Sequence, residues 1–83
     1  MTWEVIWEPG ALDTAAGHLK DAPEALDALI EAARLLETDS RPPGSLAWGT
    51  EHRRYRAGRL RVLYRIDPEK HIIHIEHIGL VVE

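Results

Sequence analysis

The sequence contains no cysteine, which excludes disulfide bonds and any metal site built on thiolates. It has no apolar run near the roughly 18 residues that a membrane-spanning helix needs. No basic segment followed by an apolar stretch, as in a secretory signal, stands at the amino terminus. The 83 residues, 45% of them hydrophobic, suffice for one small core, so we expect a single domain over residues 1–83. Together these features predict a soluble cytoplasmic protein with no membrane partner, no metal and no cofactor.

Acidic residues are missing from one stretch of the chain. Residues 52–66 contain six arginines and no acid, although the net charge of the chain is −4. The first forty residues hold nine acidic and two basic residues, whereas the remainder holds eight basic and five acidic ones. This asymmetry indicates one anion-binding face on an acidic body. A solvated surface in a protein that prefers arginine (eight) to lysine (two) explains the composition equally well.

The first half of the chain predicts one strand and two helices. Apolar residues alternate with glutamates over residues 3–8, which is typical of a half-buried strand, and Pro9-Gly10 ends it. Apolar residues then recur at helical spacing over residues 12–19 and again over 26–36. Asp21-Ala22-Pro23 interrupts the pattern between them. We therefore expect two helices that form an antiparallel hairpin.

The second half predicts a three-stranded meander. A loop rich in proline and glycine occupies residues 39–45 and cannot continue a helix. The strands that follow are expected at residues 52–57, 60–67 and 71–79. Turns at Gly58-Arg59 and at 67–70 join them. The predicted fold class is α+β, in which the amino-terminal strand and the antiparallel meander form one sheet packed on the helices.

The register of the first hairpin follows from its turn. If Gly58 and Arg59 form the loop, Arg56 faces Arg61, and side chains that face each other share one side of the sheet. The side toward the helices then carries Tyr55, Ala57, Leu60, Val62 and Tyr64. The opposite side carries His52, Arg54, Arg56, Arg61 and Arg65, here called the arginine face, together with Leu63. Because facing like charges repel, this cluster is better explained by an anionic partner, and arginine suits bidentate phosphate binding.

Residues 54–64 read Arg-Tyr-Arg-Ala-Gly-Arg-Leu-Arg-Val-Leu-Tyr, which resembles the RelE–ParE pattern R-x-R-x-G-x-Y-R-V-L-Y. The loop at 39–45 and the order of elements are also similar to that family, so the resemblance covers nearly the whole chain. It implies a RelE-like toxin of a type II toxin–antitoxin system whose partners are a cognate antitoxin, the ribosome and mRNA. In the RelE branch, such a toxin is an endoribonuclease that cuts mRNA by attack of the ribose 2′-oxygen. A homodimer and a toxin–antitoxin hetero-oligomer both remain open.

The resemblance also implies roles for individual residues. Arg61 matches the arginine that contacts the scissile phosphate, and Arg54 and Arg56 match basic positions on the preceding strand. His52 stands where some relatives hold another basic group. We therefore expect these four as catalytic residues, and Arg54, Arg56, Arg61 and Arg65 as RNA-binding residues.

Two departures from the pattern bear on activity. Leu60 replaces the aromatic residue that precedes Arg61 in the pattern. In relatives, a Gly-x-Arg segment and a catalytic aromatic or histidine follow the last strand, whereas here Gly79 is followed by Leu80-Val81-Val82-Glu83. We therefore expect weakened cleavage. Two alternatives are a non-cleaving protein of the toxin fold that binds antitoxin and RNA, and a ParE-like inhibitor of gyrase.

Three histidines near the carboxy end and one tryptophan are further candidates for a role in function. His71, His74 and His77 are spaced like metal ligands, but strict strand alternation turns His74 away from the other two, so no metal site is expected. Either His52 or His77 is a candidate for proton transfer, since histidine titrates near neutrality. Trp48, in the loop, is the only tryptophan considered for stacking on RNA; a position at the rim of the core is the alternative.

Overall fold

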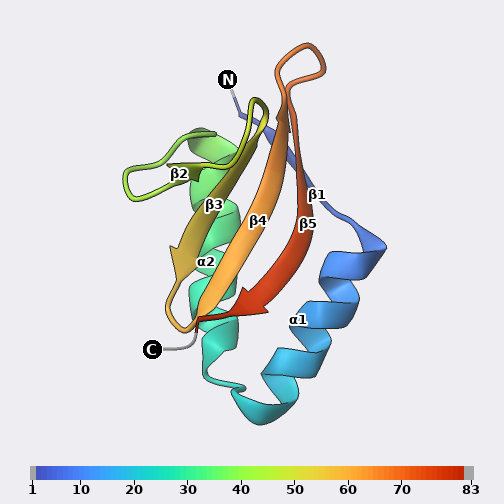
Figure 1. Ribbon diagram of the computed structural model, residues 1–83, viewed down its shortest axis with the longest axis vertical. Coiled ribbons are helices and arrows are strands. Elements are labelled where there is room, and N and C mark those ends of the chain that lie inside the picture. Colours follow the sequence, from blue (N-terminus) through green and yellow to red (C-terminus); the bar gives the residue numbers. More distant parts are fainter. Residues whose placement is uncertain (1, 82–83) are drawn as a thin grey trace.

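A computed structural model describes residues 2–81 of the protein (Figure 1). Its elements in chain order are β1 (Glu4–Trp7), α1 (Pro9–Asp21), α2 (Ala25–Thr38), β2 (Leu46–Ala47), β3 (His52–Ala57), β4 (Leu60–Asp67) and β5 (Ile72–Leu80). The predicted α+β class is confirmed, and the predicted bounds of β3 and β4 coincide with the observed ones. Within residues 2–81, neither helix is long and apolar enough to cross a membrane. Val82 and Glu83, which belong to the altered tail noted above, lie outside the described residues.

The strands form one mixed sheet in the order β1-β5-β4-β3-β2. The first strand lies parallel to the last one, with Glu4 beside Ile72, and the other pairs are antiparallel. The short strand β2 is additional to the predicted strands and pairs with β3 at Arg53 and Arg54.

The predicted register of the β3–β4 hairpin is confirmed at every pair. Ala57 faces Leu60, Arg56 faces Arg61, and His52 faces Arg65 at the far end. Side chains therefore alternate as expected. On the side of the helices Ala57, Leu60, Val62, Tyr64 and Ile66 are buried, and Tyr55 is partly buried against the core. The other side of the sheet, called the outer face below, carries the arginine face.

The core lies between the sheet and the two helices. Helix α2 crosses behind the sheet and α1 runs along β5 beyond the end of β1, in the opposite direction to α2 (Figure 1). Each helix turns small or aliphatic residues inward, which are Ala11, Ala15, Leu29, Ala32 and Leu36. They pack with three isoleucines of β5. Burial of one such large aliphatic side chain contributes about 1.5–3 kcal/mol.

A β-bulge interrupts the pairing of β5 with β4. His77 faces Leu63 and Ile75 faces Tyr64, so Glu76 is an extra residue on β5. Ile75 and Ile78 on either side of the bulge are both buried, and Glu76 and His77 therefore both lie on the outer face. The backbone N–H of Ile78 donates to Thr14 Oγ1 of α1 at 3.1 Å, which gives that amide a partner beyond the end of β1.

The bulge changes where the histidines lie. His74 faces Arg65 and His77 faces Leu63, so both are on the outer side of the sheet. The prediction that His74 faces away from His77 is wrong, because one extra residue shifts the alternation by one position. His71 is in the turn before β5 and its ring stacks on Trp3 with the ring centres 3.8 Å apart.

Candidate nucleic-acid interface

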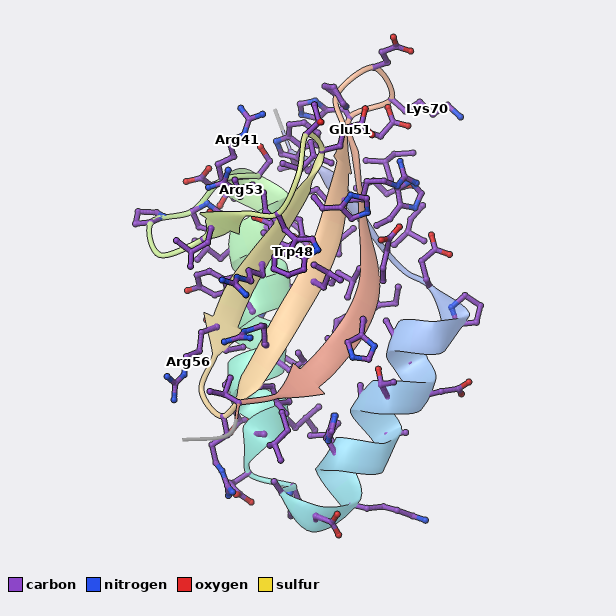
Figure 2. The ribbon with its side chains drawn as sticks, in the orientation of Figure 1. Arg41, Trp48, Glu51, Arg53, Arg56 and Lys70 are labelled. Carbon is purple, nitrogen blue, oxygen red and sulfur yellow. The ribbon has the colours of Figure 1, made fainter. Side chains whose placement is uncertain are left out.

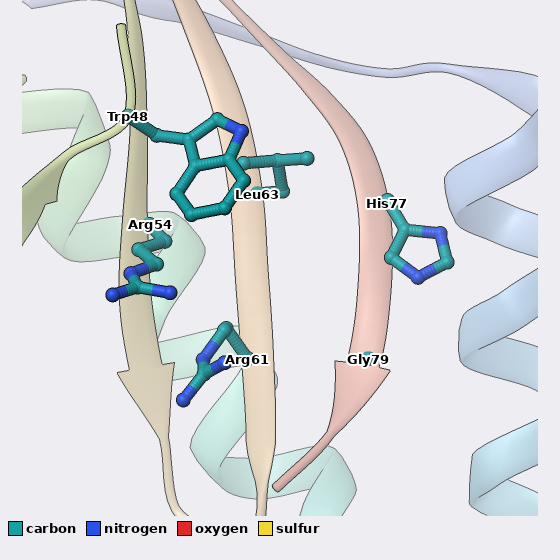
Figure 3. A pocket seen from close by; sticks show the side chains of 6 residues that line it. All are labelled: Trp48, Arg54, Arg61, Leu63, His77 and Gly79. Atoms are coloured by element: carbon teal, nitrogen blue, oxygen red, sulfur yellow. The ribbon is translucent and has the colours of Figure 1, made fainter.

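A pocket of about 160 Å³ opens on the outer face across three strands (Figure 3). This cavity, here called the Trp48 pocket, is lined by Trp48, Arg54, Arg61, Leu63, His77 and Gly79. Two of the predicted site residues, Arg54 and Arg61, thus meet here. The pocket is smaller than the roughly 300–1,000 Å³ of sites for drug-sized ligands. An apolar cavity of about 150 Å³ accommodates benzene, so this volume suits a single planar ring or a phosphate group.

The hairpin of β2 and β3 holds Trp48 over the sheet (Figure 2). Its backbone N–H donates to the carbonyl oxygen of His52 at 2.7 Å, and Gly49 makes the turn with a φ of 88° that favours glycine. The guanidinium carbon of Arg54 lies 5.0 Å from the centre of the Trp48 ring, which is a cation–π contact. Arg54 Nε is buried and has no hydrogen-bond partner among residues 2–81.

Arg61 and His77 are both neighbours of Gly79, the first across the strands and the second on β5 itself. Arg61 is exposed and faces Gly79 across the strands, so no side chain of β5 stands opposite it. A Cβ atom at Gly79 would lie 3.7 Å from His77 Nε2, which means that the imidazole lies next to the bare backbone of Gly79. The β5 side of the pocket therefore carries a titratable ring, and the β3–β4 side carries two cations (Figure 3).

An acidic residue from β5 occupies the other end of the arginine face. His52 Nε2 lies 2.9 Å from Glu76 Oε1, and Arg65 Nε donates to Glu76 Oε2 at 3.4 Å. Sequence reasoning did not assign an acid to this face, although Glu76 lies on the outer side next to the buried Ile75. The positive charge of the outer face is therefore strongest at Arg54 and Arg61 and reduced at His52 and Arg65.

Arg56 lies at the hairpin end of β3, where it projects from the sheet (Figure 2). Its Nε donates to the carbonyl oxygen of Gly58 at 2.9 Å. Arg56 directly faces Arg61 as predicted, yet it does not line the Trp48 pocket. The five predicted residues of the arginine face thus divide into a pocket pair, a pair held by Glu76, and Arg56 at the end.

Arg53 has a structural position that sequence reasoning did not single out. Its Nε and Nη2 donate to Ser45 Oγ at 3.0 and 2.9 Å, and Nη2 also donates to the Ser45 carbonyl oxygen at 3.1 Å. Beside it, the hydroxyl of Tyr64 donates to the carbonyl oxygen of Ser40 at 2.8 Å, and burial raises the pKa of Tyr64 above its usual 10.0. These contacts fasten the loop before β2 to the sheet, and thereby fix the approach to Trp48.

Residues 5–80 match the family described as the ParE toxin of the type II toxin–antitoxin system, parDE. The chain belongs to this toxin family. The RelE–ParE resemblance of residues 54–64 is therefore confirmed, and the protein is a RelE/ParE-type toxin. No curated protein sequence matches the chain.

Solved structures of the RelE type share the toxin's fold. A chain of the RelBE2 toxin–antitoxin complex from Mycobacterium tuberculosis superposes with a TM-score of 0.78 at 24% identity, and the match covers 98% of this chain and 100% of that one. A chain of the archaeal RelE–RelB complex from Pyrococcus horikoshii superposes with a TM-score of 0.76 at 22% identity, over 96% of each chain. At these identities the likeness concerns the fold alone, which is the RelE-like fold predicted from the sequence.

Proposed function

We propose that this toxin acts on RNA through the arginine face and cuts mRNA on the ribosome at a reduced rate. The observation that carries the proposal is the Trp48 pocket, where Arg54, Arg61 and His77 meet on one open surface. The cut is an attack of the ribose 2′-oxygen on the adjacent phosphate, which releases the 5′-oxygen and leaves a cyclic phosphate. The substrate supplies its own nucleophile, so the reaction requires no covalent intermediate with the protein.

Three groups assist such a reaction: a base for the 2′-hydroxyl, an acid for the 5′-oxygen, and cations for the crowded phosphate. Arg61 and Arg54 supply the cations, and Arg56 extends the positive surface toward the hairpin end of β3. Arg65 stays a proposed RNA contact, with its charge partly offset by Glu76.

Two histidines are candidates for proton transfer. His77 is exposed and lines the pocket with both arginines, and its ring extends from the side of β5 away from them (Figure 3), so it would have to turn toward a phosphate bound there. His52 remains a proposed catalytic residue, but its Nε2 lies 2.9 Å from Glu76 at the opposite end of the face. His77 is therefore the better placed of the two.

The reduced rate follows from the residue at position 81. The backbone N–H of Val81, directly after β5, donates to the carbonyl oxygen of Arg59 at 2.9 Å, which holds Val81 beside the turn between β3 and β4. Strand alternation puts it on the side of Gly79, the side of the arginine face. An apolar residue there supplies no charge to a developing phosphorane. The loss of one acid or base costs about 10²–10⁴ in rate, and the loss of a charge-stabilising donor costs about 10²–10³.

A cognate antitoxin is the proposed protein partner. Both structural neighbours come from toxin–antitoxin complexes, and the family itself is defined by such a pair. The helices also expose large apolar side chains, among them Leu12 (53% exposed), Leu26 (46%) and Ile30 (42%). Apolar surface of this extent supports a protein partner.

The family match favours one further candidate function, inhibition of gyrase, because the matching family is described as ParE. A third possibility is binding to antitoxin and RNA without cleavage. All three share the scaffold, and a fold alone does not select among them.

The test is cleavage of a defined mRNA by the purified toxin, with and without ribosomes, beside a gyrase supercoiling assay. We expect slow, ribosome-dependent cuts with cyclic phosphate ends that disappear in Arg61→Ala. Inhibition of supercoiling without any cut would replace this proposal by the gyrase candidate. Tight antitoxin binding with neither activity would support the non-cleaving alternative.

A further inference from the structure

We propose that the Trp48 pocket binds one nucleobase of the RNA, stacked against the indole of Trp48, while Arg54 and Arg61 hold the adjoining phosphates. This inference rests on the proposed function and adds the part of the substrate that the pocket takes.

Trp48 differs from the other two tryptophans in its surroundings. Trp3 and Trp7 pack against the hydrophobic core, whereas Trp48 is absent from that cluster and is 55% exposed. An aromatic side chain that packs little against the core contributes little to the stability of the fold. Its backbone is nevertheless fixed by the hydrogen bond to His52 and by the Gly49 turn. The protein thus holds an exposed planar ring in one place.

The pocket offers surfaces that complement both the base and the phosphate of a nucleotide. Trp48 and Leu63 offer apolar surface, and Arg54 and Arg61 offer positive charge beside that surface. Single-stranded nucleic acids are bound by this combination, in which bases stack on aromatic rings and a basic groove follows the backbone. The volume of about 160 Å³ suits one ring system rather than several.

Arg54 connects the two halves of the site. Its guanidinium lies 5.0 Å from the centre of the indole, so the cation remains next to the stacking surface. A base on Trp48 and a phosphate on Arg54 would then be held at once. Because every base has a stacking face, this site binds without strong base preference.

The experiment compares two probes of equal charge. One is a single-stranded 2′-O-methyl hexaribonucleotide, whose blocked 2′-oxygen prevents cleavage, and the other is the same backbone without bases. Binding of each probe is measured for wild type, Trp48→Ala, Trp48→Phe and Arg61→Ala. Leu46→Ala is the matched control, because Leu46 is an equally exposed apolar residue (56%) on the same hairpin outside the pocket. Circular dichroism establishes that each variant is folded.

We expect wild type to prefer the base-carrying probe by about tenfold, and Trp48→Ala to remove this preference. Trp48→Phe should restore part of it, and Leu46→Ala should leave it unchanged. Arg61→Ala should weaken the binding of both probes by the same factor. If Trp48→Ala keeps the wild-type preference while Arg61→Ala weakens binding, the nucleobase site is refuted and the RNA-binding function stands. If neither probe binds wild type, both proposals fail.

Discussion

Arg61 faces Gly79 across β4 and β5, so no side chain of β5 stands opposite it, and its guanidinium turns toward Arg54 on β3 (Figure 3). On the other side Arg61 faces Arg56, a like charge. A phosphate can therefore approach Arg61 from above the sheet without steric hindrance from β5, and its binding would relieve the repulsion between the two arginines.

Replacement of Arg61 by alanine should weaken RNA binding and lower its salt dependence. One fewer phosphate contact releases fewer counterions, so the slope of log affinity against log salt should fall by about 1. The measurement is binding of the hexaribonucleotide at several salt concentrations. Arg34→Ala, an equal loss of charge at an exposed site on α2, is the control. An identical slope for Arg61→Ala and wild type would show that the phosphate does not contact Arg61.

Replacement of Glu76 by glutamine should strengthen RNA binding at low salt. The change removes the only acid that pairs with His52 and Arg65 among residues 2–81 and leaves the size of the side chain unchanged. One unit charge near the surface is worth about 1 kcal/mol or less, so the gain should reach at most about fivefold and disappear at high salt. Glu31→Gln on α2 is the matched control. Weaker binding by Glu76→Gln would contradict this prediction.

Removal of the His77 side chain should lower ribosomal cleavage more than removal of His52. If His77 transfers a proton, His77→Ala should lose about 10²–10⁴ in rate, because general acid–base catalysis contributes that much. His52→Ala should lose less, since His52 lies at the Glu76 end of the face. His18→Ala on α1 controls for loss of an imidazole away from the site. A larger loss in His52→Ala would assign proton transfer to His52 instead.

An arginine at position 81 should raise cleavage. Val81 lies on the side of Gly79 and Arg61, so Val81→Arg adds a cation next to the phosphate site. The gain is expected to approach the 10²–10³ that one charge-stabilising group contributes. Leu80→Arg adds the same charge on the opposite side and should give no gain. Equal rates for the two variants would mean that position 81 is not what limits cleavage.

Tyr64→Phe should lower the free energy of unfolding by about 1 kcal/mol, since it removes the hydrogen bond to Ser40. Burial raises the pKa of Tyr64, so above pH 10 the folded protein keeps a proton that the unfolded chain releases. Wild-type stability should therefore decline as pH rises beyond that value, and this part of the decline should be absent in Tyr64→Phe. Urea unfolding at neutral and alkaline pH measures both effects. Tyr55→Phe controls for loss of a phenolic hydroxyl, and equal losses in both variants would contradict the role of the Ser40 bond.

The hairpin of β3 and β4 was predictable because local chemistry determines it. Gly58 supplies the φ of 61° that the turn needs, and alternation of arginines with apolar residues fixes the side on which each lies. A shift by one residue would bury Arg61 and expose Val62. The register of the hairpin could therefore be predicted from the sequence, and with it the position of Arg54 and Arg61 on one side of the sheet.

The β5 strand shows what sequence patterns do not contain. The residue types around Glu76 do not reveal a β-bulge, since bulges occur with ordinary residues. The extra residue nevertheless reverses the expected orientation of His77 relative to His74. The place of His77 in the pocket depends on this shift. Strand β2 escaped prediction for another reason: two residues, Leu46 and Ala47, are too few to form a pattern.

The separation of charge along the chain also affects how the toxin meets a polyanion. The acids of α1 and α2 lie on elements behind and beside the sheet, whereas Arg54 and Arg61 lie on its outer face. Such a molecule has a permanent dipole across its thinnest dimension. In the field of an RNA backbone it would turn its sheet toward the RNA before contact, and encounters through the helices would be repelled. Association should therefore be faster than the net charge of −4 suggests, and most so in dilute salt.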